Sequence, residues 1–96
     1  MTDTFLLTKA PLTSRSQLCF RLMECSRDAK LYLAGDGVYH MLGISDLPNT
    51  AVEIFACKED ILARGILTRN EIMMPDDFYG QLAKDMMENS DRVYVF

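Results

Sequence analysis

The sequence predicts an α/β fold in which helices cover both faces of a mostly parallel, five-stranded sheet. Two observations predict it: short apolar runs alternate with segments of helical periodicity, and turns rich in Gly, Asp and Pro join them. Such alternation produces right-handed βαβ crossovers, which pack as a three-layer sandwich. The 96 residues are expected to form one domain, residues 1–96, because 49% of them are apolar and can supply a core.

The first half of the chain is expected to contain two strands, a helix and a short helical turn. The strands are "TFLLTK" (4–9) and "KLYLAG" (30–35), and "VYHMLG" (38–43) supplies one or two turns. Pro11 with Thr13 and Ser14 supplies a break and an N-cap for a helix that starts near Ser14. Its apolar stripe is Leu18, Cys19, Leu22 and Met23.

The second half is expected to contain three strands and two helices. "AVEIFA" (51–56) is a near-continuous apolar run, typical of a strand covered on both faces, and "KEDILARG" (58–65) predicts a short helix. "EIMMP" (71–75) and "DRVYVF" (91–96) complete the five strands. Between them Asp76 is expected to cap a helix whose stripe is Phe78, Tyr79, Leu82, Ala83, Met86 and Met87.

Charge and composition narrow the classes of function. A net charge of -4 argues against direct nucleic-acid binding, because a phosphate backbone would be repelled. The sequence shows neither a secretory leader nor an apolar run of about 18 residues, so we expect a cytoplasmic protein without a membrane segment. Seven methionines favour an apolar patch that packs against another subunit.

Cys57 is the main candidate for chemistry because it lies where the third strand should end and a helix should begin. The free N–H groups and positive dipole end of that helix would lower a thiol pKa, as would Lys58, whereas Glu59 and Asp60 oppose this effect. We therefore expect a partial thiolate near neutral pH. The alternative is a buried cysteine that acts as a small apolar core residue, and the residues alone leave both interpretations open.

The other candidate residues predict less. Cys19 and Cys25 lie six positions apart on one helix, on different faces, and His40 is the single histidine, so no metal site is expected and His40 is interpreted as a polar loop residue. Asp36 either caps the turn after the second strand or contacts a bound group. No phosphate-binding loop or nucleophile elbow is present, and no metal or organic cofactor is expected.

Three stretches, "KLYLAGDGVYHML", "VEIFACKEDILARGI" and "EIMMPDDFYGQL", carry a resemblance to a known family. The chain resembles the DsrE/DsrF/DsrH (TusBCD) sulfur-relay proteins over nearly its whole length. It is most similar to the DsrH (TusB) branch through "DGV" (36–38) and the helix of residues 59–66. The resemblance implies a flavodoxin-like sandwich, assembly into oligomers, and sulfur carried as a cysteine persulfide towards tRNA wobble-uridine thiolation or sulfur oxidation.

The resemblance also bears on single residues. In DsrE-type proteins the sulfur-carrying cysteine precedes an Arg-Gly pair by the interval that separates Cys57 from Arg64 and Gly65 here. Many DsrH-type chains have an aliphatic residue at that place and serve as partner subunits. DsrH-type chains often finish on a tryptophan, where this chain has Phe96, so that branch's subunit contacts do not carry over directly.

Together these observations predict a sulfur-relay subunit, a possible sulfurtransferase, in which Cys57 carries the sulfur. Its predicted supporting residues are Lys58, Asp36, Gly37, Arg64 and Gly65. The expected partners are sulfur-donor and sulfur-acceptor proteins, and either further copies of the chain or DsrE/DsrF-like subunits. A non-catalytic scaffold subunit is the alternative function, and a module that binds a small ligand at the sheet's switch point is a weaker third.

Overall fold

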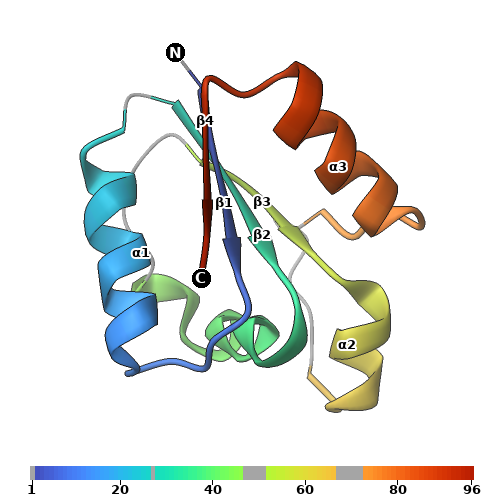
Figure 1. Ribbon diagram of the computed structural model, residues 1–96. Helices are drawn as coiled ribbons and strands as arrows, with labels where there is room; N and C mark the ends of the chain where they lie inside the picture. The colour runs from blue at the N-terminus through green and yellow to red at the C-terminus, as the bar shows by residue number, and fades with distance from the viewer. Residues whose placement is uncertain (1, 27, 47–51, 67–72) are drawn as a thin grey trace.

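The computed structural model of the chain describes residues 2–26, 28–46, 52–66 and 73–96 (Figure 1). Strands and helices alternate along it up to α2, which α3 follows directly among the described elements, and one longer 3-10 helix, η1, comes after the second strand. The elements are β1 (Thr2–Leu7), α1 (Ser14–Glu24), β2 (Asp28–Leu33), η1 (Gly35–Asp46), β3 (Val52–Ala56), α2 (Lys58–Ala63), α3 (Phe78–Glu88) and β4 (Arg92–Val95).

The sheet has the strand order β3-β2-β1-β4, and every neighbouring pair is parallel. The α/β class and the parallel sheet are thus confirmed, and the arrangement is compatible with a flavodoxin-like fold. Strand order reverses beside β1, because β2 and β3 follow it on one side and β4 lies on the other.

The prediction of five strands was wrong, since the described residues form a sheet of four. Of the predicted strand 71–75, residues 71 and 72 lie outside the described residues, and Met73 forms an isolated parallel bridge with Phe55. Both backbone groups of Met73 bond to β3, with Met73 N donating to Ile54 O at 3.1 Å and Ala56 N to Met73 O at 2.9 Å. The next residue facing β3 would be Pro75, which has no N–H to donate, and β3 itself ends at Ala56, so the ladder stops there.

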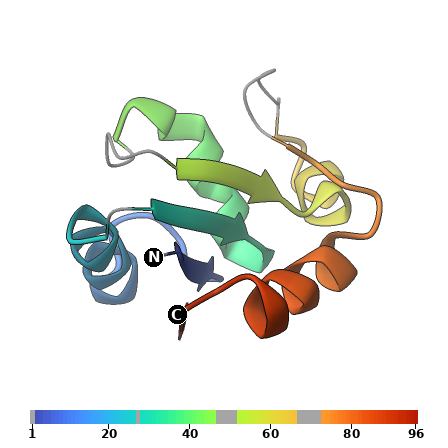
Figure 2. The same cartoon turned by 90° about the horizontal axis from the view of Figure 1, so that it is seen from above.

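The helices cover both faces of the sheet, with α1 and α3 on opposite sides (Figures 1 and 2). Alternate side chains of each strand therefore enter two separate cores. One core lies on the α1 side and joins strand residues such as Phe5 and Leu31 to Cys19 and Met23 of that helix. The other lies on the α3 side and contains Tyr32, Ala34, Phe55, Cys57, Phe78 and Leu82.

The helix α1 begins as predicted, because the Thr13 side chain caps it by accepting a hydrogen bond from Ser16 N at 3.2 Å. Its packed face differs in part from the predicted stripe. Cys19 and Met23 are buried, but Leu18 is 46% exposed and Ser16 is buried in its place. The interface with the sheet is therefore rotated towards the Ser16 side of the helix.

The cap of α3 is Asp77, and the prediction of Asp76 was wrong. The Asp77 carboxylate accepts a hydrogen bond from Gly80 N at 3.2 Å. The buried face of α3 is Phe78, Leu82 and Asp85, at i, i+4 and i+7, so the predicted stripe members Tyr79 and Met87 lie exposed. In the ranges that the structure describes, no helix has the length and apolar character needed to cross a membrane.

Candidate functional site

Cys57 lies directly after β3 and is the N-cap residue of α2. Its backbone is held from both sides: Cys57 N donates to Leu33 O of β2 at 3.0 Å, and its carbonyl accepts from Ile61 N at 3.0 Å. The side chain makes no capping hydrogen bond and is 4% exposed. The thiol thus lies at the strand-to-helix junction that the sequence predicts, and it packs into the core on the α3 side.

A pocket of about 220 Å³ borders Cys57. It opens between the start of α2 and the segment that leads into α3. Its lining residues are Cys57, Lys58, Glu59, Pro75, Asp76, Asp77, Phe78 and Tyr79. A residue that is almost fully buried is therefore adjacent to a space large enough for a small group, with a cationic side chain and a phenol beside it.

Tyr79 is the pocket residue that sequence analysis missed as a functional candidate. Burial raises the pKa of its phenol, and the neighbouring Cys57 thiol and the carboxylate of Asp60 raise it further. The phenol is therefore protonated near neutral pH and can donate a hydrogen bond towards sulfur. Its position depends on the bridge between Met73 and Phe55, which brings the segment after Met73 alongside β3. No local pattern signals that long-range contact.

The predicted supporting residues Asp36 and Arg64 meet each other, but neither lines this pocket. The Arg64 guanidinium lies 3.2 Å from Asp36 Oδ1 and 3.4 Å from Asp60 Oδ1. The Asp60 carboxylate also accepts from Gly35 N at 2.8 Å. These contacts fasten α2 to η1, so the two residues hold the helix that Cys57 caps rather than contacting the thiol.

The two predicted glycines have backbone roles. A Cβ atom on Gly37 would lie 2.0 Å from the Leu7 carbonyl oxygen, so only glycine permits the close approach of η1 to β1. Gly65 has φ +64°, the left-handed conformation predicted for it after the short helix. Of the six predicted site residues, Cys57 and Lys58 line the pocket and the other four do not.

The three cysteines differ in environment. Cys19 is fully buried on α1, and burial raises the pKa of its thiol to about 12, so it is not a nucleophile near neutral pH. Cys25 is exposed at the end of α1. Cys57 combines a sheltered position with an adjoining pocket.

His40 is a core residue, so its prediction as a polar loop residue was wrong. It is buried, its Nε2 lies 3.1 Å from the Lys9 carbonyl oxygen, and its ring meets the Phe20 ring edge to face at 5.1 Å. Burial lowers its pKa, although the contact with Lys9 opposes this effect. Within the described residues no cluster of three His, Cys, Asp or Glu side chains could hold a metal ion.

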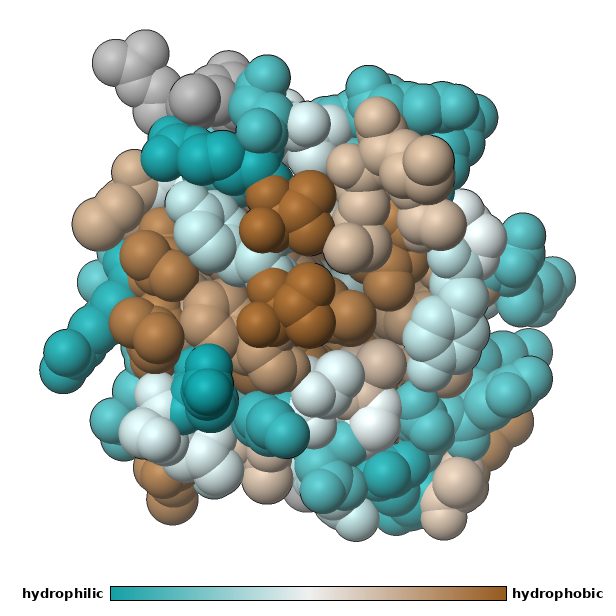
Figure 3. Space-filling model, viewed as in Figure 1, coloured by the Kyte–Doolittle hydropathy of each residue, from teal (hydrophilic) through white to brown (hydrophobic). Residues whose placement is uncertain are grey.

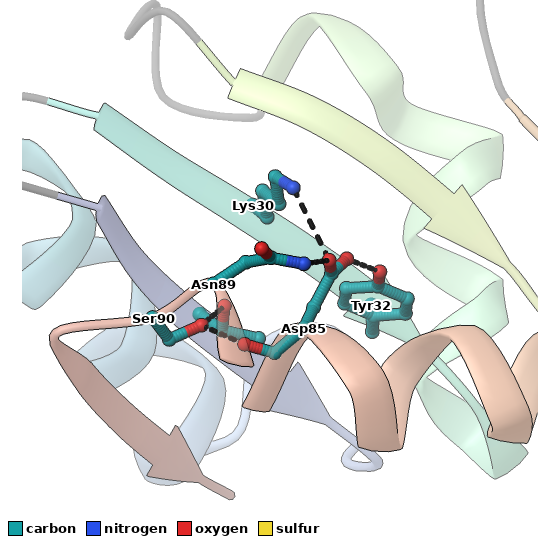
Figure 4. Close-up of polar contacts among 6 residues, drawn as sticks. Lys30, Tyr32, Asp85, Asn89 and Ser90 are labelled. Atoms are coloured by element: carbon teal, nitrogen blue, oxygen red, sulfur yellow. Dashed lines mark hydrogen bonds and ion pairs between the residues drawn. The ribbon is translucent and has the colours of Figure 1, made fainter. Parts of the chain in front are cut away.

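A second polar cluster, centred on Asp85, lies between α3 and the sheet (Figure 4). The Asp85 carboxylate accepts hydrogen bonds from the Tyr32 hydroxyl, from Asn89 Nδ2 at 3.0 Å and from Lys30 Nζ at 3.3 Å. Burial alone would raise the pKa of Asp85, but these three partners together hold it below its ordinary value. The pKa of Tyr32 is raised by burial and by the same carboxylate.

A larger pocket, of about 430 Å³, lies beside this cluster. Asp85 and Asn89 line it together with Lys84 and Gln81. The Asp85 carboxylate is already engaged by the sheet and by its own helix, so the cluster anchors α3 and does not offer a free reactive group. Since Phe78 and Tyr79 begin that helix, the anchor also fixes one wall of the Cys57 pocket.

No protein-family model matches the chain, and no curated protein matches it.

Proposed function

We propose that this protein is a sulfur-relay subunit in which Cys57 carries sulfane sulfur as a persulfide. One observation carries the proposal: a sheltered cysteine at the carboxyl end of β3 borders a pocket of about 220 Å³ that it shares with Lys58 and Tyr79. The carboxyl ends of parallel strands are the usual place for ligands and chemistry in open α/β sheets. The resemblance to the DsrE/DsrF/DsrH proteins supports the same chemistry.

The transfer is a thiol exchange. The Cys57 thiolate attacks the outer sulfur of a donor protein's persulfide, a new sulfur–sulfur bond forms on Cys57, and the donor's sulfur–sulfur bond breaks. The donor leaves as a thiolate, so no electron is gained or lost overall and no cofactor is required. A partner's thiolate then removes the outer sulfur in the same way and restores the Cys57 thiolate.

The pocket offers groups that stabilise a persulfide anion, and they act against the carboxylates of Glu59, Asp76 and Asp77, which also line it. Lys58 brings a positive charge, Tyr79 brings a protonated hydroxyl, and the first N–H groups of α2 add partial positive charge. Burial among Phe55, Phe78 and Leu82 keeps water from much of the sulfur. A carrier needs this combination because a persulfide exposed to small thiols would lose its sulfur before meeting its acceptor.

The proposed relay runs between proteins in the cytoplasm and leads to tRNA wobble-uridine thiolation or to sulfur oxidation. The acidic surface supports a place in the relay before any contact with RNA, since the net charge is -4. Its proposed partners are a sulfur-donor protein, a sulfur-acceptor protein, and either copies of the chain or DsrE/DsrF-like subunits.

The burial of Cys57 favours a second candidate, a non-catalytic scaffold subunit. A thiol with 4% exposure in an apolar cluster suits a packing role, and exposed apolar residues such as Met87 and Val95 would then dock the sulfur-carrying subunits. The two functions differ in one respect, which is whether sulfur resides on Cys57.

The test is incubation of the protein with a cysteine desulfurase and cysteine without reductant, followed by mass spectrometry of its peptides. The carrier predicts an added sulfur atom on the Cys57 peptide, lost in Cys57→Ser and retained in the control Cys25→Ser. A folded protein that gains no sulfur while forming stable complexes with partner subunits would instead support the scaffold.

A further inference from the structure

The strand β4 is an open edge of the sheet. It pairs with β1 on one side, and no described strand lies on the other. Figure 3, viewed like Figure 1 with β4 towards the viewer, shows apolar side chains gathered across the middle of this face and hydrophilic ones mainly above and below them. Open edges carry unpaired backbone groups and are commonly protected by lysine, proline or a bulge. The β4 sequence, Arg-Val-Tyr-Val, contains neither lysine nor proline.

The backbone of β4 has groups directed away from the sheet. Phe96, directly after the strand, faces β1 with both groups: Phe96 N donates to Leu6 O at 2.8 Å, and Phe96 O accepts from Thr8 N at 2.9 Å. Backbone groups alternate in direction along a strand, so those of Tyr94 also face β1 and those of Val93 and Val95 face outward. Two residues thus present donors and acceptors to a further strand.

The side chains of Val93 and Val95 are unusually exposed to solvent for a parallel sheet, whose faces are normally covered. Val93 is 37% exposed and Val95 is 60% exposed. They project to the α3 side of the sheet, opposite Tyr94, which stacks on Phe5 with ring centroids 4.9 Å apart. The helix α3 packs on the inner strands through Tyr32, so it leaves the outer strand partly bare.

We propose that two copies of this chain pair antiparallel along β4, about a two-fold axis at Tyr94, and join their four-stranded sheets into one. In this register Val93 lies opposite the partner's Val95, and Val95 opposite the partner's Val93. Each such pair exchanges two backbone hydrogen bonds and brings two valines together on the α3 side. The surface is self-complementary, as a two-fold interface must be.

Charge also favours the antiparallel arrangement. Arg92 is the one charged residue of β4. Antiparallel pairing places it opposite the partner's Phe96, four residues from the partner's Arg92, or about 14 Å at the rise of a strand. A parallel pairing in register would bring the two guanidinium groups next to each other, and the ion pair of each with Asp3, at 3.4 Å, offsets only part of the repulsion between them.

This dimer leaves the Cys57 pocket free. Cys57 follows β3, which lies at the opposite edge of the sheet from β4. The pairing does not depend on the proposed sulfur chemistry, and Cys57→Ser is expected to dimerise like the unaltered protein. Loss of sulfur transfer and loss of the dimer are therefore separable results.

The first experiment is sedimentation of the full chain over a range of concentrations, with Val95→Lys and Val95→Thr as variants. We expect a dimer that Val95→Lys converts to a folded monomer and whose dissociation constant Val95→Thr raises at least tenfold. The control Met87→Lys, which alters an exposed apolar residue on α3, leaves the dimer intact. Threonine keeps the strand preference of valine, so this variant reports on pairing even if the lysine variant does not fold.

A second experiment tests the register. In a Cys25→Ser background, Tyr94→Cys is expected to give a covalent dimer on mild oxidation, because the two-fold axis places residue 94 of each copy directly opposite the other at a Cα separation of about 4.5 Å. Val93→Cys in the same background is expected to remain uncrosslinked. A monomer at every concentration, or a dimer that Val95→Lys leaves unchanged, overturns the proposal.

Discussion

The anchor at Asp85 allows the most detailed prediction of stability. Replacement by alanine removes the carboxylate that Tyr32, Lys30 and Asn89 share (Figure 4). The Tyr32 side chain is fully buried and stays behind without this acceptor, and Lys30 loses its ion pair at 3.3 Å. Asp85→Ala is therefore expected to weaken the fold and to loosen α3 where it forms a wall of the Cys57 pocket.

The size of the expected loss of unfolding free energy in Asp85→Ala follows from the burial of the groups involved. Breaking a buried charged pair costs about 3 to 5 kcal/mol of unfolding free energy. The Lys30 side chain keeps 24% of its surface in contact with water, which offsets part of the loss and places the expected cost at about 3 kcal/mol. For a domain of this size that cost lowers Tm by about 12 to 24 °C. Asp85→Asn keeps the shape and one acceptor, so we expect about half the cost.

Urea unfolding followed by circular dichroism measures this cost, and Asp76→Ala is the matched control. Asp76 is exposed and lies before α3, so its removal is expected to change the unfolding free energy by less than about 0.5 kcal/mol. A pH series adds a second readout. Because the folded pKa of Asp85 is lowered, its contribution is present above about pH 4 and is lost as pH falls further. An Asp85→Ala cost no larger than that of Asp76→Ala would refute the reasoning.

Three further predictions concern His40, Gly37 and Tyr79. Because burial lowers the pKa of His40, the imidazole of the unfolded chain takes up a proton first as pH falls, so the free energy of unfolding is expected to drop below about pH 6.5 by up to about 1.4 kcal/mol per pH unit. Urea unfolding from pH 5 to 8 measures this dependence, and His40→Gln should show a shallower slope of unfolding free energy against pH. An equal slope would count against His40 as its origin. Gly37→Ala is expected to lower the free energy of unfolding by about 3 kcal/mol or more in the same assay, because its Cβ would meet the Leu7 backbone rather than a movable side chain. A cost under about 1 kcal/mol would contradict the close approach of η1 to β1. Tyr79→Phe is expected to leave sulfur loading of Cys57 intact but to shorten the lifetime of the persulfide about tenfold, because the lost hydrogen bond to the persulfide anion contributes about 1.5 kcal/mol. Timed quenching followed by mass spectrometry measures that lifetime, and an unchanged lifetime would remove Tyr79 from the proposed site.

The elements that the sequence predicts best are those with strong local signals. The run that ends at Ala56, the charged start of α2 and Gly65 after it correctly place Cys57 at a strand-to-helix junction. Thr13 likewise marks the start of α1. Apolar periodicity and capping chemistry depend on neighbouring residues, so one sequence is enough to detect them.

The errors arise where a distant contact decides the outcome. The described pairing of this segment with β3 is limited to Met73, since β3 ends at Ala56 and Pro75 has no N–H, and the apolar character of "EIMM" gives no sign of this. Helical periodicity also assigned Tyr79 to a buried stripe, although the helix turns it outward beside Cys57. Asp85 was the opposite case: a charged residue lies on the buried face because Tyr32 and Lys30, far away in sequence, neutralise and bond it.

The most direct test of the account asks which cysteine holds sulfur while the protein is folded. Peptide mapping after exposure to a protein persulfide donor, with and without urea, compares all three thiols in one experiment. We predict that the folded protein gains sulfur on Cys57 in preference to the exposed Cys25, and that Cys19 gains it only after unfolding. Sulfur found on Cys25 alone, with Cys57 modified only in urea, would contradict the relay.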